Sequence, residues 1–312
     1  MEISIIVLTY NAKEITLKML PSLKRSVDYF EDKSGKKAEV LLIDNASTDG
    51  VLDEIKKKFV NKDGFVKIIE NDKNLGFAKG NNLAYKSASK DSNYVLFLNP
   101  DVILDDSTIF KTYEFIKSQE NIGLVTSNVL LPNNEIDIDC HRAFPTVWNA
   151  FCYFTKLERV LGKIMPTIFG RYHMLWSDFS TPHEIDACLG AFMLVDRKVF
   201  DDVSGWSGDY FLNGEDIDFC YKIKVNEGKK IMFYPGTTVY HFKGSSKGTK
   251  KISKNFSNVS DETKNLQINS GIDAMKIFYK KFYAAKKPEL LNSLVYFGMD
   301  VLKKIRLFTK SE

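Results

Sequence analysis

The stretch Ile3-Ser4-Ile5-Ile6-Val7-Leu8-Thr9 is β-branched and almost entirely apolar, which predicts a β-strand covered on both faces. A second buried strand is predicted at residues 40–43, and further strands are predicted at residues 66–69 and 94–98. The strands are separated by three predicted helices, at residues 14–26, 51–59 and 77–89. This alternation predicts an α/β fold with a mostly parallel central sheet, flanked by helices and joined by right-handed crossovers.

Polar side chains follow each of these four strands. Ligands of open α/β sheets bind outside the carboxyl ends of the strands, so we expect these side chains to line one crevice. They are Thr9, Tyr10 and Asn11 after the first strand, Asp44 and Asn45 after the second, residues 71–74 after the third, and Asn99 and Asp101 after the fourth.

The chain is less regular beyond the fourth strand. Residues 123–185 are rich in aromatic side chains without a clear period, a pattern compatible with a core, an acceptor-binding flap or a partner surface. A returning strand is predicted at residues 187–195, where Gly190 would allow another group to approach closely. A helix at residues 217–225 and a strand at residues 230–234 are expected to follow.

Two common nucleotide-binding motifs are missing from the sequence. No strand is followed directly by Gly-x-Gly-x-x-Gly, which argues against a dinucleotide-dependent oxidoreductase. No Gly-Lys-Ser or Gly-Lys-Thr loop of the Walker type is present either, which argues against a P-loop nucleotidase.

A cluster of carboxylates stands in an aromatic segment, with Glu215, Asp216 and Asp218 inside four residues. His241 lies just downstream, and Asp101 ends an apolar strand about a hundred residues earlier. One carboxylate at a strand end, a carboxylate cluster and a single histidine predict a metal-assisted reaction with a general base. Oxygen ligands suit Mg²⁺ and Mn²⁺.

Composition and cysteine usage predict a cytoplasmic protein. The chain begins without the pattern of a signal peptide, and no apolar run approaches the roughly 18 residues needed to span a bilayer. The four cysteines are widely spaced and form no C-x-x-C pair, which predicts free, buried thiols in a reducing compartment.

The charge of the chain is unevenly distributed. Residues 243–312 carry 15 Lys and Arg against 6 Asp and Glu, whereas residues 1–242 carry 29 against 34. A basic tail on an acidic body predicts an anionic partner surface, the alternative being solvated helix faces. Because the tail lacks a recognised nucleic-acid-binding motif, a nucleic-acid partner is not expected.

Two amphipathic helices are predicted in this tail. The first presents an apolar stripe from Ile268 to Phe282, and the second spans residues 290–308 with basic residues near its end. Apolar helix faces serve both membrane binding and subunit contacts. Residues 285–312 therefore predict either a membrane-surface contact or a homodimer interface.

Five motifs occur in an order that resembles a known enzyme family. The sequence resembles the inverting family 2 glycosyltransferases of the GT-A fold, with its Rossmann-like sheet, in their rhamnosyltransferase-like branch. The resemblance implies a catalytic domain at residues 1–245, with a basic helical extension at residues 246–312. The motifs are residues 5–11 (IIVLTYN), 43–50 (IDNASTDG), 74–82 (NLGFAKGNN), 98–101 (LNPD) and 214–220 (GEDIDFC).

The resemblance implies a sugar-nucleotide donor and assigns residues to it. Asp44 matches the family aspartate that accepts a hydrogen bond from the pyrimidine ring, a role that suits an acceptor-only carboxylate. Asn81 and Asn82 match a pair under the nucleotide, and the diphosphate lies near the fourth strand. The implied donor-binding residues are Thr9, Tyr10, Asn11, Asp44, Asn45, Asn81, Asn99 and Asp101.

The resemblance also assigns the metal, the catalytic base and the acceptor site. Asp101 and His241 are the implied ligands of Mn²⁺ or Mg²⁺. Asp216 is the first choice for the base that takes the acceptor proton, and Glu215 is the second. Trp206 and Tyr210 are implied to stack on an acceptor sugar. Asp218 is interpreted as a favourable charge at a helix N-terminus.

The function implied is transfer of a hexose to a saccharide acceptor, lipid-linked, in the synthesis of a cell-surface polysaccharide. The leading donor is dTDP-L-rhamnose. A UDP-sugar-dependent galactosyl, glucosyl or N-acetylglucosaminyl transferase is the alternative, as is a subunit that binds a nucleotide sugar without turnover. The expected location is the cytoplasm, peripheral to the inner face of the plasma membrane.

Overall fold

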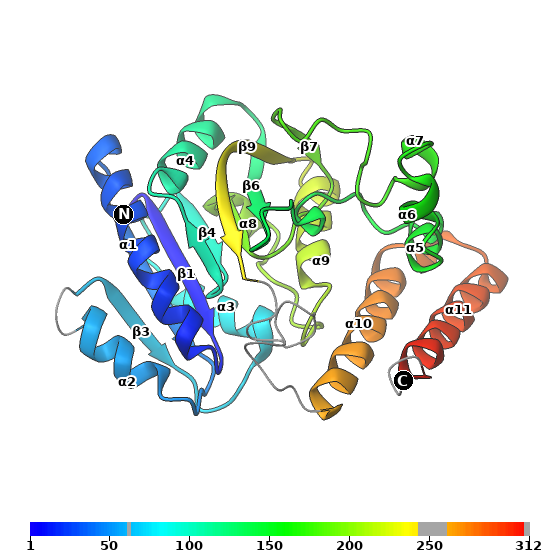
Figure 1. Cartoon of the computed structure of the whole chain (residues 1–312), viewed down its shortest axis with the longest axis horizontal. Coiled ribbons are helices and arrows are strands. Elements are labelled where there is room, and N and C mark those ends of the chain that lie inside the picture. Colours follow the sequence, from blue (N-terminus) through cyan, green and yellow to red (C-terminus); the bar gives the residue numbers. More distant parts are fainter. Residues whose placement is uncertain (61–63, 243–260, 309–312) are drawn as a thin grey trace.

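The fold is of the α/β class (Figure 1). One mixed sheet of parallel and antiparallel strands has helices packed around it. The structure is a computed structural model, and it describes residues 1–60, 64–242 and 261–308. The sheet has the order β3-β2-β1-β4-β8-β6-β9-β5, with β7 paired to β9. The strands are β1 (Ile3–Thr9), β2 (Ala38–Asp44), β3 (Val66–Glu70), β4 (Tyr94–Leu98), β5 (Val102–Leu104), β6 (Ile122–Leu130), β7 (His183–Ile185), β8 (Phe192–Asp196) and β9 (Lys230–His241).

The α-helices fall into two groups, those within the first 242 residues and two long helices that come last. The first group is α1 (Lys13–Ser34), α2 (Val51–Ile55), α3 (Gly76–Lys86), α4 (Thr108–Ser118), α5 (Val147–Phe154), α6 (Leu157–Leu161), α7 (Pro166–Phe169), α8 (Arg197–Asp202) and α9 (Glu215–Tyr221). The second is α10 (Asp261–Phe282) and α11 (Glu289–Phe308).

The N-terminal half confirms the predicted parallel arrangement. β1 pairs in parallel with β2 and β4, and β2 pairs in parallel with β3. Almost every residue of β1 is buried, as expected of a central strand with both faces covered. Beyond β4 the sheet becomes mixed, because β8 runs antiparallel to both β4 and β6.

The first helix is longer than the sequence predicted. We expected residues 14–26, whereas α1 runs to Ser34 because Val27 and Phe30 continue its buried stripe. Phe30 contacts Tyr113 of α4 edge to face. The helix ends where Gly35 adopts φ +68°, a left-handed conformation that glycine accepts without strain, and the Gly35 N–H donates to Glu31 O at 3.0 Å.

Strand β6 lies in a region where no regular element was predicted. Its apolar run is interrupted by Thr126 and Ser127, which are nevertheless fully buried. The Thr126 hydroxyl donates to Phe192 O at 2.8 Å, and the Ser127 hydroxyl donates to Thr237 O at 2.7 Å. These bonds satisfy the polar groups of a central strand, so the local sequence pattern alone did not reveal it.

The returning strand is shorter than predicted. β8 begins at Phe192, and Gly190, expected inside the strand, lies in the preceding turn. A Cβ atom at Gly190 would lie 3.3 Å from the ring of Phe77, so a side chain does approach this position closely. The predicted strand at residues 230–234 is the first part of the longer β9, which ends at His241.

The two C-terminal helices lie side by side, and α10 packs against α9 (Figure 1). Ile272, Tyr279 and Met299 form the buried contact between α10 and α11. Tyr221 stacks on Phe282 with ring centroids 4.2 Å apart, joining α10 to the end of α9. The predicted domain boundary at 245/246 lies outside the described residues.

Two further expectations concern cysteines and membrane spans. All four cysteines are buried and free, as predicted. Within residues 1–60, 64–242 and 261–308, no helix has the length and apolar character needed to cross a bilayer.

Candidate active site

A cavity of about 950 Å³ opens at the carboxyl ends of the central strands. Asp101, which follows β4, and Asp216, on α9, both line it. These carboxylates are far apart in the chain, and both line this one cavity. Asn99, Glu215 and His241 line the same polar end.

The loop after β4 is fixed at both ends by backbone hydrogen bonds. Asn99 N–H donates to Ala191 O at 3.0 Å, and Phe242 N–H donates to Asp101 O at 2.9 Å. Asp101 is only 4% exposed. The end of β9 therefore holds the Asp101 carboxylate in a defined position beside His241.

His241 lies between two buried carboxylates. Its Nε2 is 3.4 Å from Asp101 Oδ1, and its Nδ1 is 3.4 Å from Asp137 Oδ2. Burial alone would lower the pKa of this imidazole, but the two carboxylates outweigh it and raise the pKa of His241 to about 9. Sequence reasoning missed Asp137, whose only signal was an acidic pair in the irregular region, Asp137 and Asp139.

The N-terminus of α9 presents Glu215 and Asp216 at the cavity wall. Gly214 precedes them with φ +85°, and a Cβ atom there would lie 2.8 Å from the Cβ of Ala274 on α10. Glycine is therefore required both for the left-handed turn and for the close approach of α10. Glu215 and Asp216 are each 8% exposed.

Arg142 holds Asp216 in place. Arg142 Nη2 donates to Asp216 Oδ2 at 2.5 Å and to Cys188 O at 2.8 Å, while Ile217 N–H donates to Asp216 Oδ1 at 2.8 Å. Burial lowers the pKa of a guanidinium, but the Asp216 charge outweighs it and raises the pKa of Arg142 well above its usual range. Sequence reasoning missed Arg142, because nothing near it in the chain indicates this partner.

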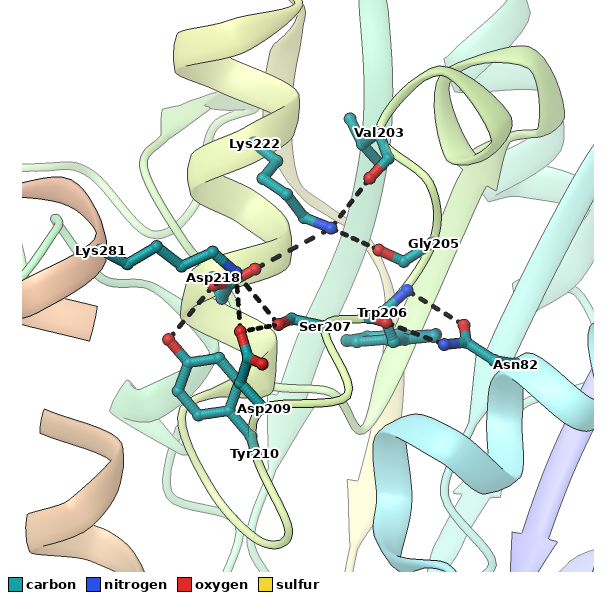
Figure 2. A network of polar contacts seen from close by, with 10 residues as sticks. All are labelled: Asn82, Val203, Gly205, Trp206, Ser207, Asp209, Tyr210, Asp218, Lys222 and Lys281. Carbon is teal, nitrogen blue, oxygen red and sulfur yellow. Dashed lines mark hydrogen bonds and ion pairs between the residues drawn. The ribbon is translucent and has the colours of Figure 1, made fainter. Parts of the chain in front are cut away.

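Asp218 lies in the first turn of α9, as predicted, and has a further structural role (Figure 2). Its carboxylate is fully buried, accepts a hydrogen bond from Tyr210 Oη at 3.2 Å and lies 2.8 Å from Lys281 Nζ of α10. Lys222 Nζ is 3.9 Å from the other oxygen. Asp218 thus anchors α10 to α9, rather than only complementing a helix terminus.

The positions of Trp206 and Tyr210 contradict their predicted stacking on a sugar. Both are 2% exposed, and neither is among the described residues that line the cavity. The Trp206 ring stacks on Phe219 with centroids 4.4 Å apart. The Asn82 side chain binds the Trp206 backbone, accepting from Trp206 N–H at 3.0 Å and donating to Trp206 O at 2.8 Å (Figure 2). These rings are occupied by protein contacts, so no face is open to a ligand.

The loops after β1 and β2 are tied together beside Asp44. Asn11 adopts φ +47°, and its Oδ1 accepts from Thr48 N–H at 2.8 Å. Asp44 is 2% exposed, and its Oδ2 accepts from Ser47 N–H at 2.9 Å. Among the described residues, Asp44 Oδ1 has no hydrogen-bond donor. A buried acceptor without a protein donor fits a ligand N–H.

Other predicted donor-binding residues have partners within the protein. The Asn45 side chain binds Asn71 and Asn74, at 2.8 and 3.0 Å, and so shapes the loop before α3. Asn81 Nδ2 donates to Phe77 O at 3.0 Å, and the Thr9 hydroxyl lies 3.1 Å from that of Thr16. Tyr10 is different, because 43% of its surface is exposed at the end of β1. Roles of these residues in donor binding stay predictions.

A family model described as "Glycosyl transferase family 2" matches residues 4–181, more than half of the chain. The chain belongs to glycosyl transferase family 2. The matched region contains β1 to β6 and the loops that carry Asp44 and Asp101.

Curated relatives of this family 2 chain are distant. It is 28% identical over 176 residues to Rhamnosyltransferase WbbL of Escherichia coli (strain K12), covering 54% of the chain and 61% of the relative. It is 25% identical over 224 residues to a poly-beta-1,6-N-acetyl-D-glucosamine synthase of Staphylococcus epidermidis, covering 72% of the chain and 46% of the relative. The chain thus spans between about half and three fifths of the length of these relatives.

Solved structures confirm the GT-A fold of this family 2 chain. S. aureus TarS 1-349 in complex with UDP-GlcNAc matches with a TM-score of 0.56 at 18% identity, covering 95% of this chain and 70% of that one. The mannosyltransferase PcManGT from Pyrobaculum calidifontis, in complex with GDP-Man and Mn²⁺, matches with a TM-score of 0.57 at 14% identity, covering 95% and 68%.

Asp101 and His241 of this family 2 chain fit a metal site in which the substrate supplies the remaining ligands. Asp101 and His241 meet at the polar end of the cavity. No cluster of three or more His, Cys, Asp or Glu side chains suited to a metal occurs in the part of the chain that the structure describes. Mg²⁺ is commonly bound by one or two carboxylates and completed by substrate phosphates, and a site of this kind needs no larger protein cluster.

Proposed function

We propose that this chain is an inverting glycosyltransferase that moves a hexose from a nucleotide-diphospho-sugar to a saccharide acceptor. The observation that carries the proposal is the cavity that Asp101 and Asp216 line together. One carboxylate there suits the diphosphate and its metal, and the other suits an acceptor hydroxyl.

The chemistry is a single displacement at the anomeric carbon. The acceptor oxygen forms a bond to this carbon while the bond to the diphosphate breaks, and the nucleoside diphosphate leaves with the electron pair. The acceptor proton goes to a carboxylate, with Asp216 the first choice and Glu215 the second. Arg142 holds the Asp216 carboxylate in one orientation. Asp101 and His241 would hold Mn²⁺ or Mg²⁺, which would supply positive charge to the leaving diphosphate.

The donor that we propose is a dTDP- or UDP-sugar, with dTDP-L-rhamnose the leading candidate. Asp44 Oδ1 is a buried acceptor, and the N3–H of uracil or thymine is the matching donor. The rhamnosyltransferase relative supports rhamnose as the transferred sugar, and the N-acetylglucosamine synthase relative supports N-acetylglucosamine as the alternative.

We propose that the acceptor is a lipid-linked saccharide and that transfer takes place at the inner face of the plasma membrane. Support comes from the outer face of α11, where Leu290 and Phe297 are 76% and 68% exposed and Lys304 is exposed nearby. Flotation with anionic vesicles should recover the full chain and lose it when Leu290 and Phe297 are both replaced by Ser. If the wild type does not float, and the double variant is a monomer where the wild type is a dimer, this face is a homodimer interface instead.

A donor screen tests the proposal directly. Nucleoside diphosphate release is followed for dTDP-L-rhamnose, UDP-galactose, UDP-N-acetylglucosamine and UDP-glucose, with and without Mn²⁺. We expect metal-dependent release from at least one donor. Tight donor binding without release from any of them would instead indicate a subunit that binds a nucleotide sugar and does not turn it over.

A further inference from the structure

The cavity that holds the catalytic carboxylates has a second, apolar end. This apolar groove runs between α5 and the α10–α11 pair. Its walls include Ala150, Phe151 and Phe154 from α5, and Leu294, Val301 and Ile305 from α11. The polar and apolar parts form one continuous space. A molecule that reacts at Asp216 can therefore extend into the groove.

The walls of the groove are more exposed than those of a closed core. Phe151 is 50% exposed, Leu294 is 59% exposed and Ile305 is 52% exposed. Large apolar side chains gathered in a concave, open surface mark a binding site for an apolar ligand. Such a ligand would remove their apolar surface from water, which is favourable in proportion to the area covered.

One contact crosses the groove. The Arg306 guanidinium of α11 lies over the Phe154 ring of α5, 4.8 Å from its centroid, and so bridges the two walls. A second helix, about 10 Å wide with its side chains, would have to displace this contact to lie along the whole groove. A hydrocarbon chain is thinner, so the bridged groove favours it as the occupant.

The surface on either side of the groove is also apolar. Val160 and Ile164, in and after α6, are 68% and 76% exposed, and Phe297 on α11 is 68% exposed. Figure 1 shows α5, α6 and α7 next to α11, and the contact between Arg306 and Phe154 confirms that α5 and α11 are neighbours. The groove thus opens between two apolar flanks suited to the surface of a bilayer.

We propose that the apolar groove binds the hydrocarbon chain of the acceptor, so that the acceptor is an amphiphile drawn from a lipid surface. This inference rests on the proposed function, because it places the acceptor hydroxyl at Asp216. The saccharide lies at the polar end of the cavity, and a long alkyl or prenyl chain lies between α5 and α11. The chain length of the acceptor, and not only its sugar, then determines affinity.

Alkyl maltosides are probes of this groove because they join a saccharide to a chain of chosen length. Binding of octyl, decyl and dodecyl maltoside to the full chain is measured by calorimetry below their micellar concentrations. Each buried methylene contributes about 0.8 kcal/mol, so Kd should fall by up to about 15-fold for every two methylenes. The affinity for UDP is measured on the same samples and reports on the donor site.

Gly298→Phe is designed to fill the groove. Gly298 lines the groove, and a Cβ atom there would meet nothing within 4 Å. We expect this variant to bind dodecyl maltoside at least tenfold more weakly, to lose the dependence on chain length, and to keep the affinity for UDP. Gly271→Phe, at a second open glycine of the lining, should act in the same way. Ser293→Phe is the matched control, because Ser293 is exposed on α11 outside the described lining.

The outcomes separate this inference from the proposed function. Affinity that does not depend on chain length, or unchanged binding by both glycine variants, overturns the inference even if donor turnover is intact. A dimer that Gly298→Phe converts to a monomer also overturns it, because the groove would then hold a second copy. Absence of both UDP binding and donor turnover in the wild type would reject the proposed function, whatever the maltosides do.

Discussion

Lys281 Nζ lies 2.8 Å from Asp218 Oδ2, and this ion pair joins α10 to the helix that carries Glu215 and Asp216 (Figure 2). The Asp218 side chain is fully buried, whereas that of Lys281 is one-third exposed. The pair therefore connects the C-terminal helices to the wall of the cavity. Loss of this ion pair should lower the free energy of unfolding of the whole fold.

Lys281→Met is predicted to lower the free energy of unfolding by about 2 kcal/mol, because it leaves the buried Asp218 carboxylate with weaker partners. The expected loss is below that for a fully buried pair, since solvent already reaches Lys281. Urea denaturation measures the change. Lys280→Met, on the exposed side of the same helix, is the control, and equal midpoints for the two variants would show that the pair does not stabilise the protein.

Asp44→Asn tests recognition of the donor base. The wild type should bind UDP and dTDP more tightly than CDP, because N3 of cytosine carries no hydrogen to donate to Asp44 Oδ1. Replacing the carboxylate should weaken UDP binding by roughly 10- to 100-fold, the range for a hydrogen bond to a charged group. Calorimetry with the three nucleotides measures both effects. Equal affinity of the wild type for UDP and CDP would remove Asp44 from base recognition.

The pH dependence of stability should carry opposite contributions from two buried histidines. Burial and the neighbouring His183 lower the pKa of His141 to about 4, whereas its unfolded value is about 6.5. The stability that neutral His141 contributes is therefore complete above pH 6.5 and is lost as the pH falls through 4. His141→Asn should make the loss of Tm between pH 7 and pH 4.5 shallower.

His173 provides the contrast. Burial opposes its charge, but Asp139 and Glu158 outweigh burial and raise the pKa of His173. Its stabilisation is present below pH 6.5 and is lost as the pH rises through the raised value, so His173→Asn should cost more stability at pH 5.5 than at pH 8.5. The same change of slope in both variants would contradict these assignments.

Removal of the metal should abolish nucleoside diphosphate release, and Mn²⁺ should restore it. In the wild type, Mn²⁺ should also strengthen UDP binding, because Asp101 would hold the ion and the ion would attract the diphosphate. Asp101→Asn should reduce UDP affinity to the metal-free value. Asp105→Asn, at an exposed aspartate in the next turn, is the control. A response to Mn²⁺ in Asp101→Asn equal to that of the wild type would show that this carboxylate is not a ligand.

Local patterns in the sequence were sufficient for the first half of the fold. Mostly apolar runs identify β1 to β4, and the rule that ligands bind at strand ends places Asp101 beside the cavity. The motif around Glu215 and Asp216 identified the second group of carboxylates, and these line the same cavity. These features are local, so the residues that define them are near one another in the chain.

Features that depend on distant partners were not predictable in this way. Thr126 and Ser127 are satisfied by Phe192 and Thr237, so a central strand looked irregular in the sequence. The role of Arg142 depends on Asp216, 74 residues away. The family resemblance implied that Trp206 stacks on an acceptor sugar, but its ring packs on the protein core. Each difference arises from a tertiary contact and not from the local pattern.

The central claim is that Asp216 accepts the acceptor proton in the cavity that it shares with Asp101, and Asp216→Asn tests this most directly. Turnover is measured by nucleoside diphosphate release, and donor affinity by calorimetry, beside Glu215→Gln and the exposed control Asp202→Asn. We expect Asp216→Asn to lower turnover by about 10²- to 10⁴-fold and to leave donor affinity unchanged. Turnover equal to that of Asp202→Asn, or an equal loss of turnover and donor affinity, would contradict it.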